Sequence, residues 1–114
     1  MSNLNLQRLT DAVSASPQLL PEDMPAVAAA GFRSVVNNRP DQEGGPTQPT
    51  SASIEAAASA AGLAYAHLPV QPAFQSAEEA AALGALLETL PSPVLLFCRS
   101  GARSARLFTA AHPG

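Results

Sequence analysis

The stretch PVLLFCRSGARSAR, residues 93–106, decides how the rest of the chain is interpreted. An apolar run rich in β-forming residues ends at Cys98, the one cysteine of the sequence, and a small-residue turn containing Gly101 leads into a segment typical of a helix. Such a strand–turn–helix directs backbone N–H groups into a small concavity at the positive end of the helix. This helix end, together with Arg99 and Arg103, would stabilise a thiolate, so we expect the pKa of Cys98 to lie below its ordinary value of about 8.5. The pattern predicts a nucleophilic cysteine at the floor of an anion-binding loop.

Composition indicates one packed domain with a small anionic substrate. The 114 residues are 46% hydrophobic and only 13% charged, which suits a single globular core over residues 1–114. The net charge of −3 and the lack of a basic run argue against nucleic-acid binding. Three of the six basic residues nevertheless lie within eight positions of Cys98, namely Arg99, Arg103 and Arg106. This local charge favours an anionic ligand, either thiosulfate or a persulfide, or a phosphate ester.

Cysteine and histidine content limits the other chemistries. One cysteine cannot form an internal disulfide, and one cysteine with two distant histidines cannot make a metal site, so we expect neither a metal nor a cofactor. The N-terminal segment has no long apolar core, which argues against a signal peptide or a membrane anchor. We therefore expect a reducing, cytoplasmic location, in which Cys98 would stay usable.

Helices and strands are predicted to alternate along the chain after residue 20. Residues 4–16 indicate two short strands in a hairpin, and further strands are expected at 32–37, 63–70 and 93–97. Helices are expected at 21–30, at 51–61 with Ser51 or Ser53 as the cap, at 77–90 with a Ser76–Glu79 capping box, and after the cysteine loop. This order predicts an α/β fold with a mainly parallel sheet covered by helices on both faces.

In a parallel sheet the site lies at the carboxyl ends of the strands, and three such ends carry polar or reactive residues. They are residues 37–41 (NNRPD), the loop after Val70, and Cys98. Asp41 is the candidate general acid for ester hydrolysis, although an Asp beside Pro in a loop also suits ordinary turn chemistry. Arg39 could line the pocket or pair with an acid.

The CRSGARS loop at 98–104 resembles the active-site loops of two classes of cysteine enzymes. Protein tyrosine and dual-specificity phosphatases use Cys-x5-Arg, whereas rhodanese-type sulfurtransferases typically use a loop one residue shorter. Here Cys98 and Arg103 form Cys-x4-Arg, which is the rhodanese spacing.

Nearly the whole chain, by contrast, resembles the phosphatase-like domain of beta-lactamase-hydrolase-like proteins, which also occurs in small stand-alone bacterial proteins. The matching segments are SPQ at 16–18, PED at 21–23, AAAGFRSVVNNRPD at 28–41, AGLAYAHLPV at 61–70 and the cysteine loop. The resemblance implies a dual-specificity-phosphatase-like fold with Cys98 as nucleophile and Arg103 as the loop arginine, in a family described variously as phosphatases or sulfurtransferases. Members usually continue for a few more helices, whereas here the helix after the loop has barely two turns before Gly114. A shortened C-terminus could expose apolar surface to a partner protein or a second copy.

Three functions remain open on these grounds, and we rank them by the length of the loop between Cys98 and Arg103. The first is sulfur transfer through a Cys98 persulfide, because a shorter loop offers one fewer N–H to a bulky phosphoryl group and this reaction needs no general acid. The alternative is phosphate-ester hydrolysis through a cysteinyl-phosphate, and the second alternative is a catalytically silent anion-binding or interaction module. The predicted catalytic residues are Cys98 and Arg103 for either reaction, with Asp41 as the candidate acid for ester hydrolysis. The predicted substrate-binding residues are Arg99, Ser100, Gly101, Ala102, Ser104 and Arg39.

Overall fold

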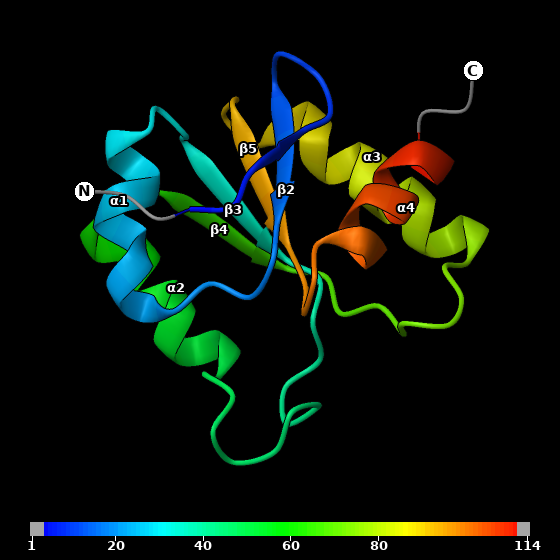
Figure 1. Ribbon diagram of the computed structural model, residues 1–114. Coiled ribbons are helices and arrows are strands. Elements are labelled where there is room, and N and C mark those ends of the chain that lie inside the picture. The colour runs from blue at the N-terminus through cyan, green and yellow to red at the C-terminus, as the bar shows by residue number, and fades with distance from the viewer. Residues whose placement is uncertain (1–3, 112–114) are drawn as a thin grey trace.

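The computed structural model describes residues 4–111 and shows one α/β unit (Figure 1). Its strands are β1 (Gln7–Arg8), β2 (Val13–Ser16), β3 (Ser34–Asn37), β4 (Ala64–His67) and β5 (Val94–Phe97). Its helices are the 3₁₀ turn η1 (Pro21–Asp23), α1 (Met24–Ala29), α2 (Ser51–Ala60), α3 (Ala77–Thr89) and α4 (Ala102–Ala111). None of the helices within residues 4–111 is long and apolar enough to cross a membrane.

The strands form one sheet in the order β1-β2-β5-β3-β4. β1 pairs with β2 in the antiparallel hairpin that the sequence predicts, and all other pairs are parallel. β5 therefore lies between β2 and β3, with Phe97 in register with both Ser16 and Asn37. This arrangement confirms the predicted mainly parallel sheet and aligns four carboxyl ends at one edge.

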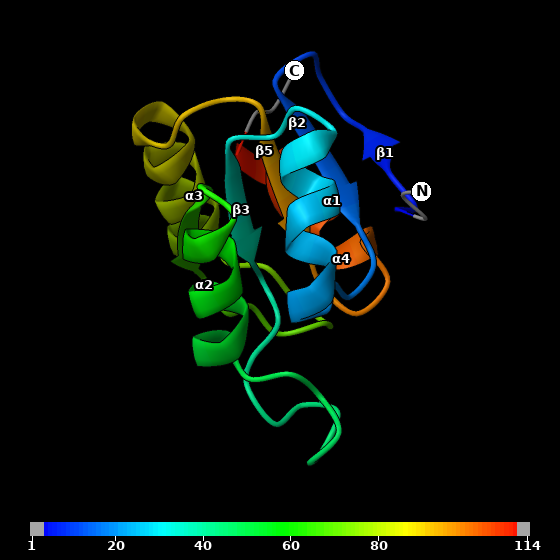
Figure 2. The same cartoon turned by 90° about the vertical axis from the view of Figure 1, so that its left-hand side faces the viewer.

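Helices cover both faces of the sheet: α1 and α2 lie on one face, and α3 and α4 on the other (Figures 1 and 2). Because side chains alternate along a strand, β5 sends Val94 and Leu96 into the core beneath α3 and α4, and Leu95 and Phe97 into the core beneath α1 and α2. All of these side chains are at most 1% exposed. A strand that is apolar on both faces is typical of a parallel sheet, which explains why this run was recognisable in the sequence.

Helix ends agree with the sequence at some positions and differ at others. The Ser76–Glu79 capping box at the start of α3 is confirmed, with N–H to side-chain bonds of 2.8 and 3.0 Å. The cap of α2 was predicted wrongly: Thr50, not Ser51 or Ser53, accepts the Ser53 N–H, at 3.1 Å. α4 spans ten residues, so the expectation of barely two turns was also wrong.

Candidate active site

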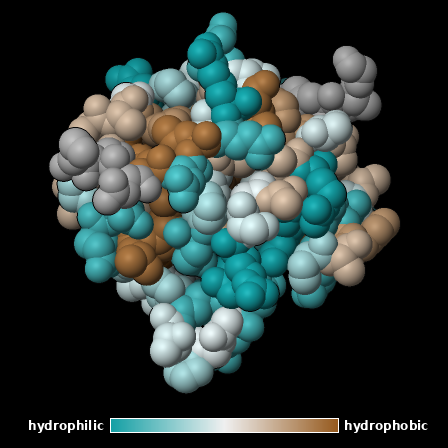
Figure 3. Space-filling model, viewed as in Figure 1, coloured by the Kyte–Doolittle hydropathy of each residue, from teal (hydrophilic) through white to brown (hydrophobic). Residues whose placement is uncertain are grey.

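Four loops meet at the carboxyl ends of the parallel strands, below the sheet in Figure 1. They follow β2 (residues 17–20), β3 (38–50), β4 (68–76) and β5 (98–101). Hydrophilic surface gathers in this part of the molecule, where the 38–50 loop extends beneath the strands (Figure 3). The sequence prediction that three of these strand ends converge is thus confirmed by the sheet order.

Cys98 lies directly after β5 and is 1% exposed. Its Sγ accepts the backbone N–H of Gly101 at 3.0 Å. Gly101 has a φ of +93°, and a Cβ at this position would lie 3.2 Å from the carbonyl carbon of Ser16. Both the positive φ and the close approach of β2 require glycine, so the loop's tight turn over the sulfur depends on this residue.

The environment of Cys98 favours its thiolate. Burial alone raises the pKa of the thiol, but hydrogen bonds from the Ser104 N–H and hydroxyl and from the N–H groups of Ser100 and Gly101 outweigh it, so the pKa lies below its ordinary value. The N–H groups of Ser100 and Gly101, just before α4, and of Ser104, in its first turn, thus stabilise negative charge on the sulfur. A thiolate is the nucleophilic form of cysteine, so this loop suits covalent catalysis.

The Ser104 hydroxyl links the cysteine loop to the neighbouring strand ends. It is buried and donates to Oδ1 of Asn38 at 2.8 Å, and Nδ2 of Asn38 donates to the carbonyl of Leu68 at 3.0 Å. A hydroxyl has a single proton, so it can donate to Asn38 while the thiol is neutral and donate to the sulfur once the thiolate has formed. Ser104 is therefore well placed to help ionise Cys98.

Arg103, in the first turn of α4, is 5% exposed and makes three hydrogen bonds through its terminal nitrogens. Nη1 donates to the carbonyl of Val70 at 3.1 Å and to Oε2 of Glu43 at 3.0 Å, and Nη2 donates to Oε1 of Glu43 at 3.0 Å. Its Nε is buried and has no partner within residues 4–111. A guanidinium has five N–H donors, so Nε–H and one Nη2–H remain on the second edge of the group. That edge has the geometry of a bidentate site for an oxyanion.

Arg39 and Glu43 complete this polar cluster. Arg39 is 8% exposed, and its Nε donates to Oε1 of Glu43 at 2.9 Å while its Nη1 donates to Oε1 of Gln18 at 3.0 Å. Burial raises the pKa of Glu43, but the hydrogen bonds and the charges of Arg103 and Arg39 lower it more. The pKa therefore lies below its ordinary value, and the carboxyl stays ionised at neutral pH. Arg39 thus does both things that the sequence left open, because it lines the cavity and pairs with an acid.

These side chains surround an open cavity of about 460 Å³. Its lining residues come from the loops after β3, β4 and β5 and from α4: Arg39, Glu43, Gly44, Pro72, Arg99 and Arg103. Glu43 was not among the residues predicted from the sequence, although it lies two residues after Asp41. Among the residues that the structure describes, no three His, Cys, Asp or Glu side chains are placed to hold a metal ion.

The remaining candidate residues lie around this cluster in different roles. Arg99, Ser100 and Ala102 are exposed on the cysteine loop, and the Ser100 hydroxyl accepts the N–H of Ala102 at 3.4 Å. Asp41 is exposed, and its Oδ1 accepts the N–H of Ser51 at 2.7 Å at the start of α2. The structure therefore shows Asp41 in the turn chemistry that was its alternative interpretation, and its role as an acid stays a prediction.

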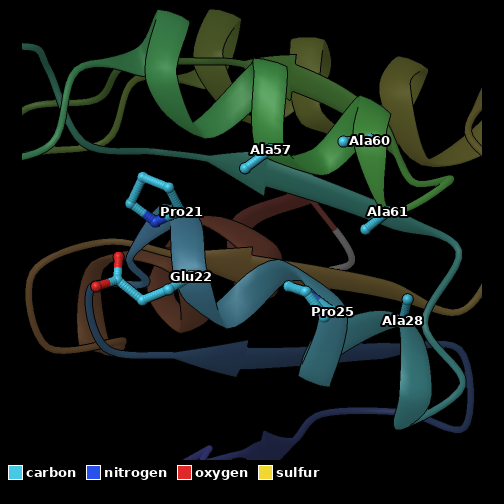
Figure 4. A pocket seen from close by; sticks show the side chains of 7 residues that line it. All are labelled: Pro21, Glu22, Pro25, Ala28, Ala57, Ala60 and Ala61. Atoms are coloured by element: carbon cyan, nitrogen blue, oxygen red, sulfur yellow. The ribbon is translucent and has the colours of Figure 1, made fainter.

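A second cavity, of about 490 Å³, is lined by none of the residues of the cysteine loop. It is a groove between η1, α1 and α2 (Figure 4), lined by Pro21, Glu22, Pro25, Ala28, Ala57, Ala60 and Ala61. Apart from Glu22, these side chains are apolar and offer no nucleophile. We therefore assign the active site to the cavity lined by Arg99 and Arg103, which both belong to the cysteine loop.

A buried cysteine between a parallel strand and a helix, with a buried arginine in the first turn of that helix, is typical of cysteine-dependent enzymes. Residues 5–114 match the model of the family described as "Beta-lactamase hydrolase-like protein, phosphatase-like domain", and the chain belongs to this family. A beta-lactamase hydrolase-like protein of Agrobacterium fabrum is 31% identical over 101 residues, which cover 89% of this chain. The chain spans only 23% of the length of that relative.

Solved structures show the same fold, and one of them is described as a proposed phosphatase. A proposed phosphatase from Neisseria meningitidis is 30% identical, with a TM-score of 0.83 over 95% of this chain and 74% of that one. TpbA from P. aeruginosa, in a complex with phosphotyrosine, has a TM-score of 0.63 at 16% identity, over 89% of this chain and 57% of that one. The predicted dual-specificity-phosphatase-like fold and family resemblance are confirmed.

The preference for sulfur transfer was wrong. The family is a phosphatase-like one, and the 30% identical structure is that of a proposed phosphatase. The error has a physical reason: the prediction treated the anion site as a product of the 98–104 loop alone. In the structure Arg103 is also held by Glu43 from the loop after β3 and by Val70 near the beginning of the loop after β4, so loop length does not set the site by itself. The chain is an enzyme domain of the phosphatase-like hydrolase class.

Proposed function

We propose that this domain hydrolyses phosphate monoesters, with Cys98 as the nucleophile and Arg103 as the ligand of the phosphoryl oxygens. The observation that supports this most directly is the pairing of a low-pKa cysteine with a buried guanidinium whose second edge is unengaged. The tetrahedral phosphoryl group has the paired oxygens that such an edge binds. The N–H groups at the start of α4 would bind the remaining charge.

The reaction has two displacement steps. The Cys98 thiolate attacks phosphorus, the S–P bond forms, and the P–O bond to the leaving group breaks with its electron pair going to that oxygen. Water then attacks the cysteinyl-phosphate, the P–S bond breaks, and inorganic phosphate and the thiolate are released. Arg103 stabilises the charge on the equatorial oxygens in both steps.

The leaving oxygen needs a proton unless it is a good leaving group. Glu43 is a poor donor because two guanidinium groups keep it ionised. Asp41 remains the proposed acid, and it would have to leave the Ser51 N–H to serve. Aryl esters depend least on this acid, because a phenolate leaves more readily than an alkoxide, so we propose phosphotyrosine-like aryl phosphates as substrates.

The test is steady-state hydrolysis of an aryl phosphate by wild type and Cys98→Ser, with mass spectrometry of acid-quenched enzyme. We expect turnover and a phosphate adduct on Cys98 in the wild type, and neither in the variant. Turnover that survives in Cys98→Ser would refute the assignment of the nucleophile. We also propose a reducing, cytoplasmic location, because the reaction requires a free thiol at Cys98.

A further inference from the structure

We propose that Glu43 is the positioning residue for Arg103: its carboxylate holds one edge of the guanidinium so that the other edge faces the substrate's phosphoryl oxygens. The identity of the substrate rests on the proposed function, but the role of Glu43 concerns any oxyanion that binds beside Cys98. The competing interpretation is that Glu43 occupies the anion site itself and must be displaced by substrate.

The count of N–H donors on Arg103 decides between these two interpretations. The carboxylate of Glu43 takes one N–H each from Nη1 and Nη2, and Val70 takes the second N–H of Nη1. Three of the five donors are then used, and the two left, Nε–H and the second Nη2–H, are parallel and on one edge. Because the guanidinium is planar and rigid, Glu43 and a phosphoryl group can bind to different edges at the same time. The buried Nε without a partner is the donor that such a group would satisfy.

Glu43 is itself held from two sides, which makes it a rigid support. Oε1 of Glu43 accepts from Arg39, and Arg39 donates to Gln18 in the loop after β2. The Gly44 N–H donates to the side chain of Gln48, whose amide donates back to the carbonyl of Pro40 at 2.9 Å. The cluster therefore connects Arg103 to the loops after β2 and β3, and the loop around Glu43 is braced within itself.

Gly44 supplies a way to disturb this support without removing a charge. A Cβ at this position would lie 2.6 Å from Nη2 of Arg39, and no positive φ is involved, so an alanine would push the Arg39 guanidinium away. Without Glu43, in turn, two largely buried guanidinium groups would face each other with no carboxylate between them. Their repulsion would take Arg103 out of its present orientation.

The decisive experiment compares Glu43→Gln with wild type and with Glu88→Gln, a control that removes an exposed carboxylate on α3. The affinity for inorganic phosphate is read from its protection of Cys98 against alkylation by iodoacetamide, a measurement that needs no turnover. We expect Glu43→Gln to weaken protection on the order of 10- to 100-fold, because charge-assisted hydrogen bonds that orient the arginine are lost. The KM for an aryl phosphate should rise with it, while the alkylation rate without phosphate keeps its pH dependence. Glu88→Gln should match wild type in all three readouts.

Gly44→Ala is the second variant, and it should weaken phosphate protection less than Glu43→Gln but in the same direction. Equal or tighter phosphate binding by Glu43→Gln would overturn the proposal and indicate a competing carboxylate. Protection of wild type without turnover of any aryl phosphate would refute the proposed function alone. No protection of wild type at all would overturn both.

Discussion

Removing the Ser104 hydroxyl should make Cys98 harder to ionise, and the size of the effect can be worked from its surroundings. Ser104 is fully buried, and its hydroxyl is among the groups that lower the pKa of the thiol. A hydrogen bond to a charged group contributes about 1.5–3 kcal/mol. We take the lower end, because sulfur accepts weakly and because the N–H groups of Ser104, Ser100 and Gly101 remain in Ser104→Ala. About 1.4 kcal/mol is a tenfold change in an equilibrium, so roughly tenfold less thiolate should be present at a pH below the wild-type pKa.

The assay is the rate of Cys98 alkylation by iodoacetamide across pH, in the absence of phosphate. Ser104→Ala should react about tenfold more slowly at low pH and reach the wild-type rate at high pH, because only ionisation has changed. Thr109→Ala is the matched control: it also removes a hydroxyl from α4, but that hydroxyl is exposed and donates to the carbonyl of Ala105 at 3.0 Å. An unchanged profile in Ser104→Ala would refute the argument that the hydroxyl stabilises the thiolate.

Three further predictions follow from the same site. Arg103→Lys keeps the charge but loses the planar edge, so kcat/KM for an aryl phosphate should fall roughly 100-fold while the alkylation rate of Cys98 without phosphate changes little; equal activity would refute bidentate binding. Asp41→Asn should slow alkyl phosphates but leave esters with good leaving groups nearly unaffected, and chemical denaturation should show little loss of stability because Asn can still accept the Ser51 N–H; equal slowing of both ester classes would contradict a proton-donor role. Folding lowers the pKa of Cys98, so the free energy of unfolding, relative to Cys98→Ser, should rise as pH increases from the folded pKa to the unfolded value near 8.5. This gain should disappear as pH falls through the folded pKa, and urea titrations at several pH values measure it.

The fold was predictable because its main signals are local. Runs of Val, Leu and Phe that are apolar on both faces mark parallel strands, and Pro, Gly and capping residues mark the helices between them. Helix ends were less certain, as Thr50 shows: several neighbouring Ser and Thr residues could accept the same N–H groups, and the backbone geometry chooses among them.

The candidate site was predictable where it is contiguous in the sequence. The Cys98–Gly101 turn and the buried Arg103 were both found from the 93–106 stretch. Glu43 was missed because its partner Arg103 is sixty residues away and the two meet only when β5 inserts between β2 and β3. Local reasoning instead chose Asp41, the acid next to Pro40, although its carboxylate is used to start α2. The signal that could have pointed to Glu43 is its position two residues after Asp41, in a loop expected at the same end of the sheet as the arginines of the cysteine loop.

The conflict between a rhodanese-like spacing and a phosphatase-like chain has a structural explanation. A longer loop provides an oxyanion with more N–H groups of its own, so a shorter one suggests a smaller anion when it is considered alone. Here Arg103 lies in the first turn of α4, and carbonyl and carboxylate groups from two other loops hold its charge in place. In the proposed reaction, the edge of Arg103 that is fixed from outside the loop would bind the oxyanion together with the N–H groups of the short loop. If this domain hydrolyses phosphate esters as proposed, the Cys-x4-Arg spacing alone does not discriminate between sulfur and phosphorus chemistry, and the acid that supports the arginine is a further feature by which such sites can be compared.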